Sequence, residues 1–178
     1  MNIKHKKYTA TLFAILAAAL YAINIPISKL LLRNVDATMM AGFLYLGAGF
    51  ENNCTKMISN KSSEEIVVIK GIFSGLGSVI IALIIGENIP STKYILAVLL
   101  LGFVAYGLSI NFYIMAQKDL GAAKTSAYYS IAPFLGVAFS MILLGERPRW
   151  QFYVALGIIV ISTFIMIKDT DEVVDSVK

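Results

Sequence analysis

The feature that most constrains this chain is a series of long apolar blocks that few charged residues interrupt. A helix rising 1.5 Å per residue needs about 20 apolar residues to cross a hydrocarbon core about 30 Å thick. The blocks that approach or meet this length are Tyr8–Leu32, Ile66–Gly86, Tyr94–Ala116, Thr125–Gly145 and Trp150–Ile167. They do not alternate apolar and polar residues, as membrane strands would. We therefore predict an all-α integral membrane protein.

The composition agrees with this prediction. Hydrophobic residues make up 58% of the chain and charged residues 15%, whereas a soluble domain carries roughly a quarter charged residues. The single cysteine, Cys54, cannot form an internal disulfide. The net charge of +4 needs no nucleic-acid partner, because the distribution of lysines has a membrane explanation.

A shorter apolar run, Ala37–Phe50, ends in the polar sequence ENNCTK rather than in a turn. As a helix this run measures about 21 Å, which is too short for the bilayer core. No Pro or Gly stops a helix between Gly49 and the SNKSS loop. We therefore predict one continuous or gently bent helix from Met39 to about Lys56, which brings the total to about six transmembrane helices.

Six spans place both ends of the chain on the same side of the membrane. With the N-terminus inside, the cytoplasmic segments hold most of the Lys and Arg residues, as the positive-inside rule expects. We predict that the N- and C-termini are cytoplasmic. The acidic segment 169–178 is predicted to be a disordered cytoplasmic tail.

A weak internal repeat accompanies these spans. Sliding the chain by 29 residues pairs Asn24 with Asn53 and Gly42 with Gly71. The two copies would lie in opposite membrane orientations, as in transporters built from inverted repeats.

Two prolines are expected inside helices, Pro26 in the first and Pro133 in the fifth. Each removes a backbone donor and frees a carbonyl, and in a membrane such a kink faces protein or water rather than lipid. Polar residues cluster around both prolines and at the end of the short run. The candidates for a polar substrate path are Asn24, Pro26, Glu51, Asn52, Asn53, Asn111, Tyr129, Ser130 and Pro133.

Each candidate also has a structural interpretation. Glu51 either lines a cavity, as intramembrane charges generally do, or lies at the membrane interface in an awkward helix. Tyr106, Asn111 and Tyr113 are the polar groups of the fourth helix, where hydrogen bonds between helices are the safer interpretation. Prolines are frequent in membrane helices in any case.

Small residues at helical spacing predict close helix packing. Gly71 and Gly75 form a GxxxG motif, and Gly136 lies between Ala132 and Ser140 on a second small-residue face. Both patterns permit close backbone approach, within one chain or between two.

The sequence contains few features that are typical of an enzyme. It contains one His and one Cys, and it has no HExxH, GxSxG or phosphate-binding loop. No nucleophile is paired with a base. We expect neither catalytic residues, nor a metal site, nor a cofactor.

The stretch YGLSINFYIMAQKDLGAAKTSAYYSIAPFLGVAFSMILLGERP, Tyr106 to Pro148, resembles the end of an EamA domain of the drug/metabolite transporter superfamily. The similarity lies in LGAA at a turn, Ala-Pro in the next helix, and LLGE-x-P. LFAILAAALYAINIPISKLLL resembles the opening helix of such a domain, and ENNCTKMISNKSSEEIVVIKGIFSG resembles the junction of the first two helices of the second repeat.

The usual member of this family has ten helices in two five-helix repeats. The resemblance therefore implies that about four helices are absent between Gly49 and Glu51. Residues 1–50 then represent a partial first repeat, and 51–168 most of the second.

The resemblance implies a secondary transporter that moves small metabolites, amino acids or drugs across the plasma membrane by alternating access. An exporter is expected, with the lipid bilayer and a small-molecule substrate as partners. A six-helix chain would close a cavity by pairing as a homodimer or with a second half-transporter. The alternative is a non-transporting membrane protein, either a degenerate deletion product or an accessory subunit.

Overall fold

The computed structural model describes residues 3–59 and 65–176, and within these ranges it is built of helices without strands. The described helices join into six rods. These rods are α1 (Ile3–Ala22) with α2 (Asn24–Leu31), α3 (Ala37–Ser59), α4 (Glu65–Ile84), α5 (Thr92–Leu101) with the π-helical η2 (Gly102–Leu108) and α6 (Ser109–Leu120), α7 (Ala122–Tyr129) with α8 (Ala132–Leu144), and α9 (Trp150–Ser176). The prediction of an all-α chain with about six spans is confirmed.

Three rods contain apolar segments long enough by themselves to cross a bilayer, namely Lys6–Leu31, Thr92–Leu120 and Ala122–Leu144. The other three rods contain shorter apolar segments, Ala37–Phe50, Gly71–Ile84 and Trp150–Ser162. Those segments belong to helices of 23, 20 and 27 residues, so each rod is long enough to span the core. The fold is that of an integral membrane protein.

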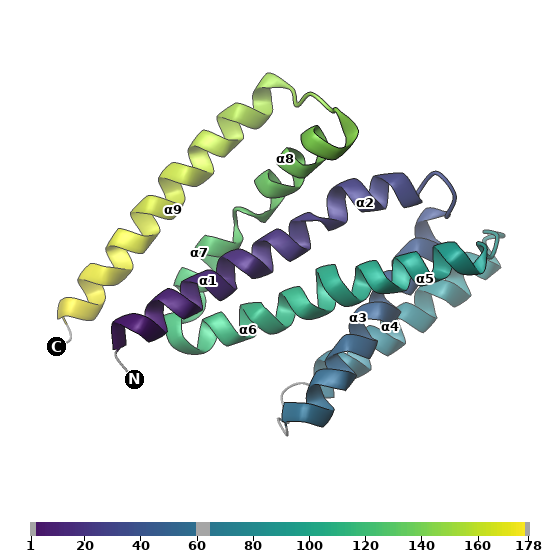
Figure 1. Ribbon diagram of the computed structural model, residues 1–178, viewed down its shortest axis with the longest axis horizontal. Coiled ribbons are helices and arrows are strands. Elements are labelled where there is room, and N and C mark those ends of the chain that lie inside the picture. Colours follow the sequence, from purple (N-terminus) through teal and green to yellow (C-terminus); the bar gives the residue numbers. More distant parts are fainter. Residues whose placement is uncertain (1–2, 60–64, 177–178) are drawn as a thin grey trace.

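The rods run up and down between two ends of the molecule (Figure 1). The α2–α3, α4–α5 and α8–α9 connections lie at one end, and the start of α1, the α6–α7 turn and the end of α9 lie at the other. This alternation agrees with the predicted topology. We call the first of these ends the outer end and the second the inner end, following the predicted orientation.

The packing divides into two parts. On one side, α3 packs against α4 and crosses α5 and η2. On the other side, α1 packs against α6, α7 and α8, while α2 contacts α8 and α9 contacts α7. Figure 1 shows α1–α2 and α5–α6 as long central rods, with the α3–α4 hairpin diverging on one side and α7, α8 and α9 on the other.

Helix α3 is continuous from Ala37 to Ser59, so the predicted helix from Met39 to about Lys56 is confirmed. Asn24 and Asn53, which the sequence repeat pairs, differ in setting, because the rod breaks just before Asn24 but continues through Asn53. The side chains of Glu51, Asn52 and Asn53 lie outside the described residues. Their place in a substrate path stays a prediction.

The segment from residue 169 differs from its prediction as a disordered tail. Helix α9 continues to Ser176. The physical reason lies in the sequence, where no Pro or Gly after Lys168 stops the helix. Negative charge alone does not end a helix.

Glycines bring α3 and α4 into backbone contact. A Cβ built on Gly71 would lie 2.9 Å from the Cα of Gly49, and one on Gly75 would lie 2.9 Å from the carbonyl oxygen of Gly42. Gly71 and Gly75 therefore lie where the backbones of α3 and α4 approach each other within one chain. Their partners, Gly42 and Gly49, lie seven residues apart on one face of α3 and were not predicted.

A second close approach joins α3 to the rod formed by α5, η2 and α6. A Cβ on Gly47 would lie 2.2 Å from the carbonyl oxygen of Leu99, and one on Gly102 would lie 2.2 Å from that of Leu44. A buried apolar cluster lies between this crossing and the outer end of the molecule. Its buried members are Leu31, Val35, Met39, Met40, Ala82, Val98, Leu101 and Ala105.

Candidate substrate site

Two rods are interrupted close to their prolines. The first breaks at Ile23, between α1 and α2. Pro26 cannot donate to the carbonyl of Ala22, so the regular hydrogen-bond ladder cannot continue there. The second breaks at Ser130 and Ile131, where Pro133 leaves the carbonyl of Tyr129 without its helical donor.

The rod formed by α5, η2 and α6 is also irregular, since η2 adopts π-helical geometry over Gly102–Leu108. Long π-helical segments are rare and are frequently found at functional sites. This one begins at Gly102, where the backbone of α3 presses against the rod. Tertiary packing therefore coincides with the change in helix geometry.

Hydrogen bonds connect the first break to the π-helical segment. The Asn24 amide nitrogen donates to the Tyr106 hydroxyl at 3.2 Å, and Ser28 Oγ donates to the Asn24 amide oxygen at 2.8 Å. Asn24 follows the break directly, and Tyr106 lies within η2. The polar side chains thus meet where both rods are irregular.

Aromatic contacts extend this cluster to the third irregular rod. The ring of Tyr106 lies 6.3 Å from that of Tyr45 and 5.5 Å from that of Tyr21. Tyr21 in turn lies 5.8 Å from Tyr129, which is 5.1 Å from Tyr113. We call Tyr45, Tyr106, Tyr21, Tyr129 and Tyr113 the tyrosine row. It joins α3, η2, α1, α7 and α6.

Hydroxyl contacts fix the inner part of the row. Ser109 is buried, and its Oγ donates to the carbonyl oxygen of Ala17 at 2.9 Å. Because Ser109 has only one hydroxyl proton, its 3.3 Å contact with the Tyr129 hydroxyl is donated by Tyr129. The Tyr113 hydroxyl lies 2.7 Å from Ser126 Oγ. These contacts orient both rings.

A cavity of about 470 Å³ lies beside the row. It is lined by Ile110, Tyr113, Ile114, Ser126, Tyr129 and Ser130, from α6 and the α7–α8 rod. We call it the α6–α7 cavity. A second cavity, of about 520 Å³, is lined only by apolar residues and glycines of α3, α4, α5 and η2. The first cavity has the mixture of apolar walls and a few polar groups that small-molecule sites share.

The structure brings several sequence candidates together and separates others. Asn24 and Tyr129 belong to the cluster, and Ser130 lines the α6–α7 cavity. Pro26 is fully buried, whereas Pro133 is exposed in the first turn of α8. Asn111 is half-buried on α6.

Gly136, which was predicted to lie on a packing face, is close to the first break. A Cβ there would lie 2.2 Å from Ile25 Cδ1 and 3.1 Å from the carbonyl oxygen of Ala22. This oxygen is the one that Pro26 leaves without a helical donor. Gly136 therefore lets α8 approach the kink closely.

Tyr21 and Tyr45 were not among the predicted residues, and Tyr106 and Tyr113 were expected to form structural hydrogen bonds. Tyr21 and Asn24 are three residues apart, which places them on one helix face, so a signal existed on the first helix. The contribution of Tyr45 comes from α3 crossing η2. No pattern along the sequence indicates that crossing.

Polar side chains join different rods at the outer end. The Lys29 ammonium lies 2.5 Å from a carboxylate oxygen of Glu146, and the Asn88 N–H donates to Asp36 at 3.2 Å. Glu87 accepts from the N–H groups of Thr38 and Met39, at 3.1 and 2.7 Å. This carboxylate caps the N-terminus of α3.

The environment of Glu87 acts on its ionisation in opposite directions. Partial desolvation raises the pKa of its carboxyl, while hydrogen bonds from the Thr38 side chain and from the backbone of Met39 and Thr38 lower it. The hydrogen bonds prevail, so the pKa lies below its ordinary value. A carboxylate at a helix N-terminus is also favoured by the helix dipole.

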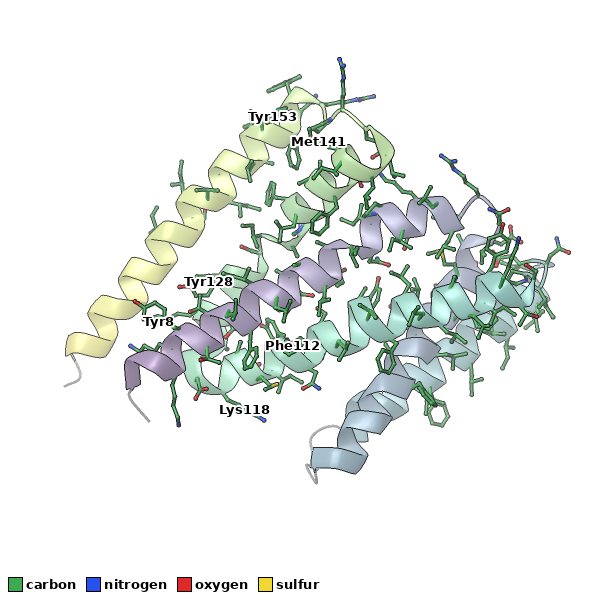
Figure 2. All side chains as sticks on the ribbon, viewed as in Figure 1. Tyr8, Phe112, Lys118, Tyr128, Met141 and Tyr153 are labelled. Atoms are coloured by element: carbon green, nitrogen blue, oxygen red, sulfur yellow. The ribbon has the colours of Figure 1, made fainter. Side chains whose placement is uncertain are left out.

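Tyr153 lies on α9 near the outer end, as Figure 2 shows, and its side chain is exposed. Figure 2 also shows Phe112 between the central rods, where its ring stacks on that of Phe13 with centroids 5.5 Å apart. The position of Tyr153 fits the aromatic belt of a membrane interface. Within the described ranges, no three His, Cys, Asp or Glu residues gather as metal ligands.

Six helical rods, three of them irregular around one polar cluster, define a helical membrane protein with features that transporter folds share. The model of the EamA-like transporter family matches residues 53–168, more than half of the chain. The chain belongs to this family, and so to the drug/metabolite transporter superfamily. Proteins of the family are transporters rather than enzymes. No curated protein and no solved structure matches the chain.

Proposed function

We propose that this chain is a secondary carrier that exports a small metabolite, amino acid or drug across the plasma membrane by alternating access. The tyrosine row with Asn24 forms the floor of the substrate path. The observation that carries the proposal is the meeting of three irregular rods at one hydrogen-bonded cluster. Interrupted helices in membranes are tolerated where they line a cavity or are buried in protein.

The outer end supports an alternating-access mechanism. Contacts between Lys29 and Glu146, and between Glu87 and the start of α3, join different rods there. Such contacts hold the outer end closed while the α6–α7 cavity lies nearer the inner end. Opening the outer end requires that they break, and bistable contacts of this kind accompany domain closure in other proteins.

We further propose the predicted orientation, with both termini cytoplasmic, and the division into a partial first repeat over 1–50 and most of a second over 51–168. The family match to residues 53–168 supports this division. A second copy of the chain, or a second half-transporter, completes the cavity. Reporter fusions near residues 34, 90 and 147 should be external, and those near residues 60, 120 and 175 cytoplasmic.

Transport by the purified protein in vesicles tests the proposal. Efflux of a panel of amino acids, small metabolites and drugs should identify a substrate, and Asn24→Leu should lower its flux at least about tenfold, because a polar contact of the path is lost. Phe73→Leu is the matched control, since Phe73 is 73% exposed on α4. It should leave flux unchanged.

A folded protein that moves no compound of the panel would overturn the carrier proposal. It would favour the non-transporting alternative, a deletion product or an accessory subunit. Equal flux through wild type and Asn24→Leu would retain the carrier but remove Asn24 from its path.

A further inference from the structure

The α6–α7 cavity has a chemistry that selects among substrates. Its described lining consists of two tyrosines, two serines and two isoleucines, none of which carries a formal charge at neutral pH. No ion, positive or negative, would meet a countercharge on these walls. A purely apolar molecule would form no hydrogen bond with either serine.

The two tyrosine rings form a corner. Tyr113 and Tyr129 meet at 76°, with centroids 5.1 Å apart. Both border the cavity, and both hydroxyls are engaged, by Ser126 and by Ser109. Hydroxyl bonding therefore holds the rings in place, so a molecule in the corner would meet rings of fixed orientation.

The serine beside the corner also favours a positive ligand. Ser130 Oγ donates its proton to the carbonyl oxygen of Ala127 at 2.7 Å. Any further hydrogen bond to this hydroxyl is therefore one that it accepts. Aromatic faces attract cations through the ring quadrupole, and paired rings of this kind recognise quaternary ammonium groups.

The depth of the cavity lowers the cost of holding a charge. Tyr113 is seven residues from Leu120, where α6 ends, which is about 10 Å along the helix. The penalty for a charge is largest at the bilayer centre and falls toward the interface. A cation in the inner half of the membrane can keep part of its hydration.

We propose that the α6–α7 cavity binds an organic ammonium cation, with the rings of Tyr113 and Tyr129 against the charged group. This inference deepens the proposed carrier function, on which it rests for its physiological meaning. It assigns the substrate class as small organic cations.

Binding is tested by calorimetry on the protein in nanodiscs of phosphatidylethanolamine and phosphatidylglycerol, which carry no choline headgroup. The probes are choline, tetramethylammonium and tetraethylammonium. The control ligand is 3,3-dimethylbutan-1-ol, which has the shape of choline without its charge. At least one cation should bind, and choline should bind about tenfold more tightly than its neutral isostere.

Variants locate the site. Tyr113→Leu and Tyr129→Leu should each weaken cation binding about tenfold, because the aromatic ring is lost. Tyr113→Phe keeps the ring and should weaken binding less than Tyr113→Leu does. Phe103→Leu removes a ring from the other cavity and should change nothing. The comparison of choline with its isostere uses wild-type protein alone, so it stands even where a variant misfolds.

Failure of all three cations to bind, or equal binding of choline and the isostere, would overturn the inference. So would unchanged binding in well-folded Leu variants. Cation binding without transport in vesicles would overturn the carrier function and keep the cation site. Transport of uncharged or anionic compounds without cation binding would keep the carrier function and overturn the cation site.

Discussion

The α3–α4 hairpin and the tyrosine row stabilise their helices in contrasting ways. In the hairpin, regular helices approach until glycine backbones touch, as Gly71 does at Gly49. Around the row, the helices are interrupted or π-helical, and side chains such as Asn24 and Tyr106 join them.

This difference has a physical basis. In the hairpin every peptide group can be satisfied within its own helix, so the two backbones can pack without polar side chains between them. Irregular helices leave carbonyls exposed, and these are tolerated beside polar side chains or water. The hairpin therefore serves as scaffold, and the row is the place where we propose that a substrate replaces water.

The largest expected effect comes from breaking the scaffold. Replacing Gly71 and Gly75 together with Leu should destabilise the protein by about 1–3 kcal/mol per site, because the new side chains meet α3 backbone that cannot move away. Thermal unfolding in detergent, followed by size-exclusion chromatography, measures the loss.

The matched control replaces Gly77 and Gly157 with Leu, since a Cβ at either position meets nothing within 4 Å. This variant should unfold close to the wild-type temperature. If both double variants were equally stable, the hairpin would not be the tight scaffold that the glycine contacts indicate.

A smaller effect is expected from the row. A double-mutant cycle with Asn24→Ala and Tyr106→Phe should give a coupling energy of about 0.6 kcal/mol, the average for hydrogen bonds between membrane helices. Tyr153→Phe is the control, because this exposed ring lies on α9 away from the row. The variants should affect transport far more than stability, and the opposite ranking would make the row a structural element.

The sequence alone predicted the scaffold better than the row. The length of the apolar blocks fixed the number of spans, and the absence of Pro or Gly after Gly49 predicted the continuous α3. GxxxG spacing predicted contacts at Gly71 and Gly75. These features are local, because they depend on hydrophobicity and helix periodicity along one segment.

The row depends on contacts between segments far apart in the sequence. Asn24 and Tyr106 are separated by 82 residues, and η2 coincides with the place where Gly102 meets Leu44 of α3. The prolines indicated where two rods would break. They could not indicate which tyrosines from other helices would gather there.

The cap of α3 gives a pH-dependent test of the scaffold. The pKa of Glu87 is lowered in the folded protein, so its contribution to stability is present above the unfolded-state pKa and is lost as the pH falls through the folded-state pKa. Wild type should therefore lose more stability than Glu87→Gln on acidification across that window. Asp119→Asn, on the inner end of α6, should keep the wild-type profile; parallel profiles for wild type and Glu87→Gln would show that the cap is not formed.

A last pair of variants sharpens the comparison between packing and hydrogen bonding. Ser140 and Ser109 are both buried, at 1% and 0% exposure, yet within the described residues the Ser140 hydroxyl has no hydrogen-bond partner while that of Ser109 donates to Ala17. Removing a buried hydroxyl without a partner relieves a desolvation cost, so Ser140→Ala should leave stability unchanged or raise it by up to about 1 kcal/mol.

Ser109→Ala leaves the carbonyl of Ala17 and the hydroxyl of Tyr129 without their side-chain contact and should cost about 1 kcal/mol. Thermal unfolding of the two variants side by side gives the contrast directly. If Ser140→Ala lost as much stability as Ser109→Ala, a polar contact would hold α8 against the first rod. The small-residue packing at Gly136 would then not suffice to explain that interface. A gain in stability for Ser140→Ala would indicate that close packing holds α8 in place, as it holds the hairpin. Hydrogen bonding between helices would then belong to the tyrosine row alone.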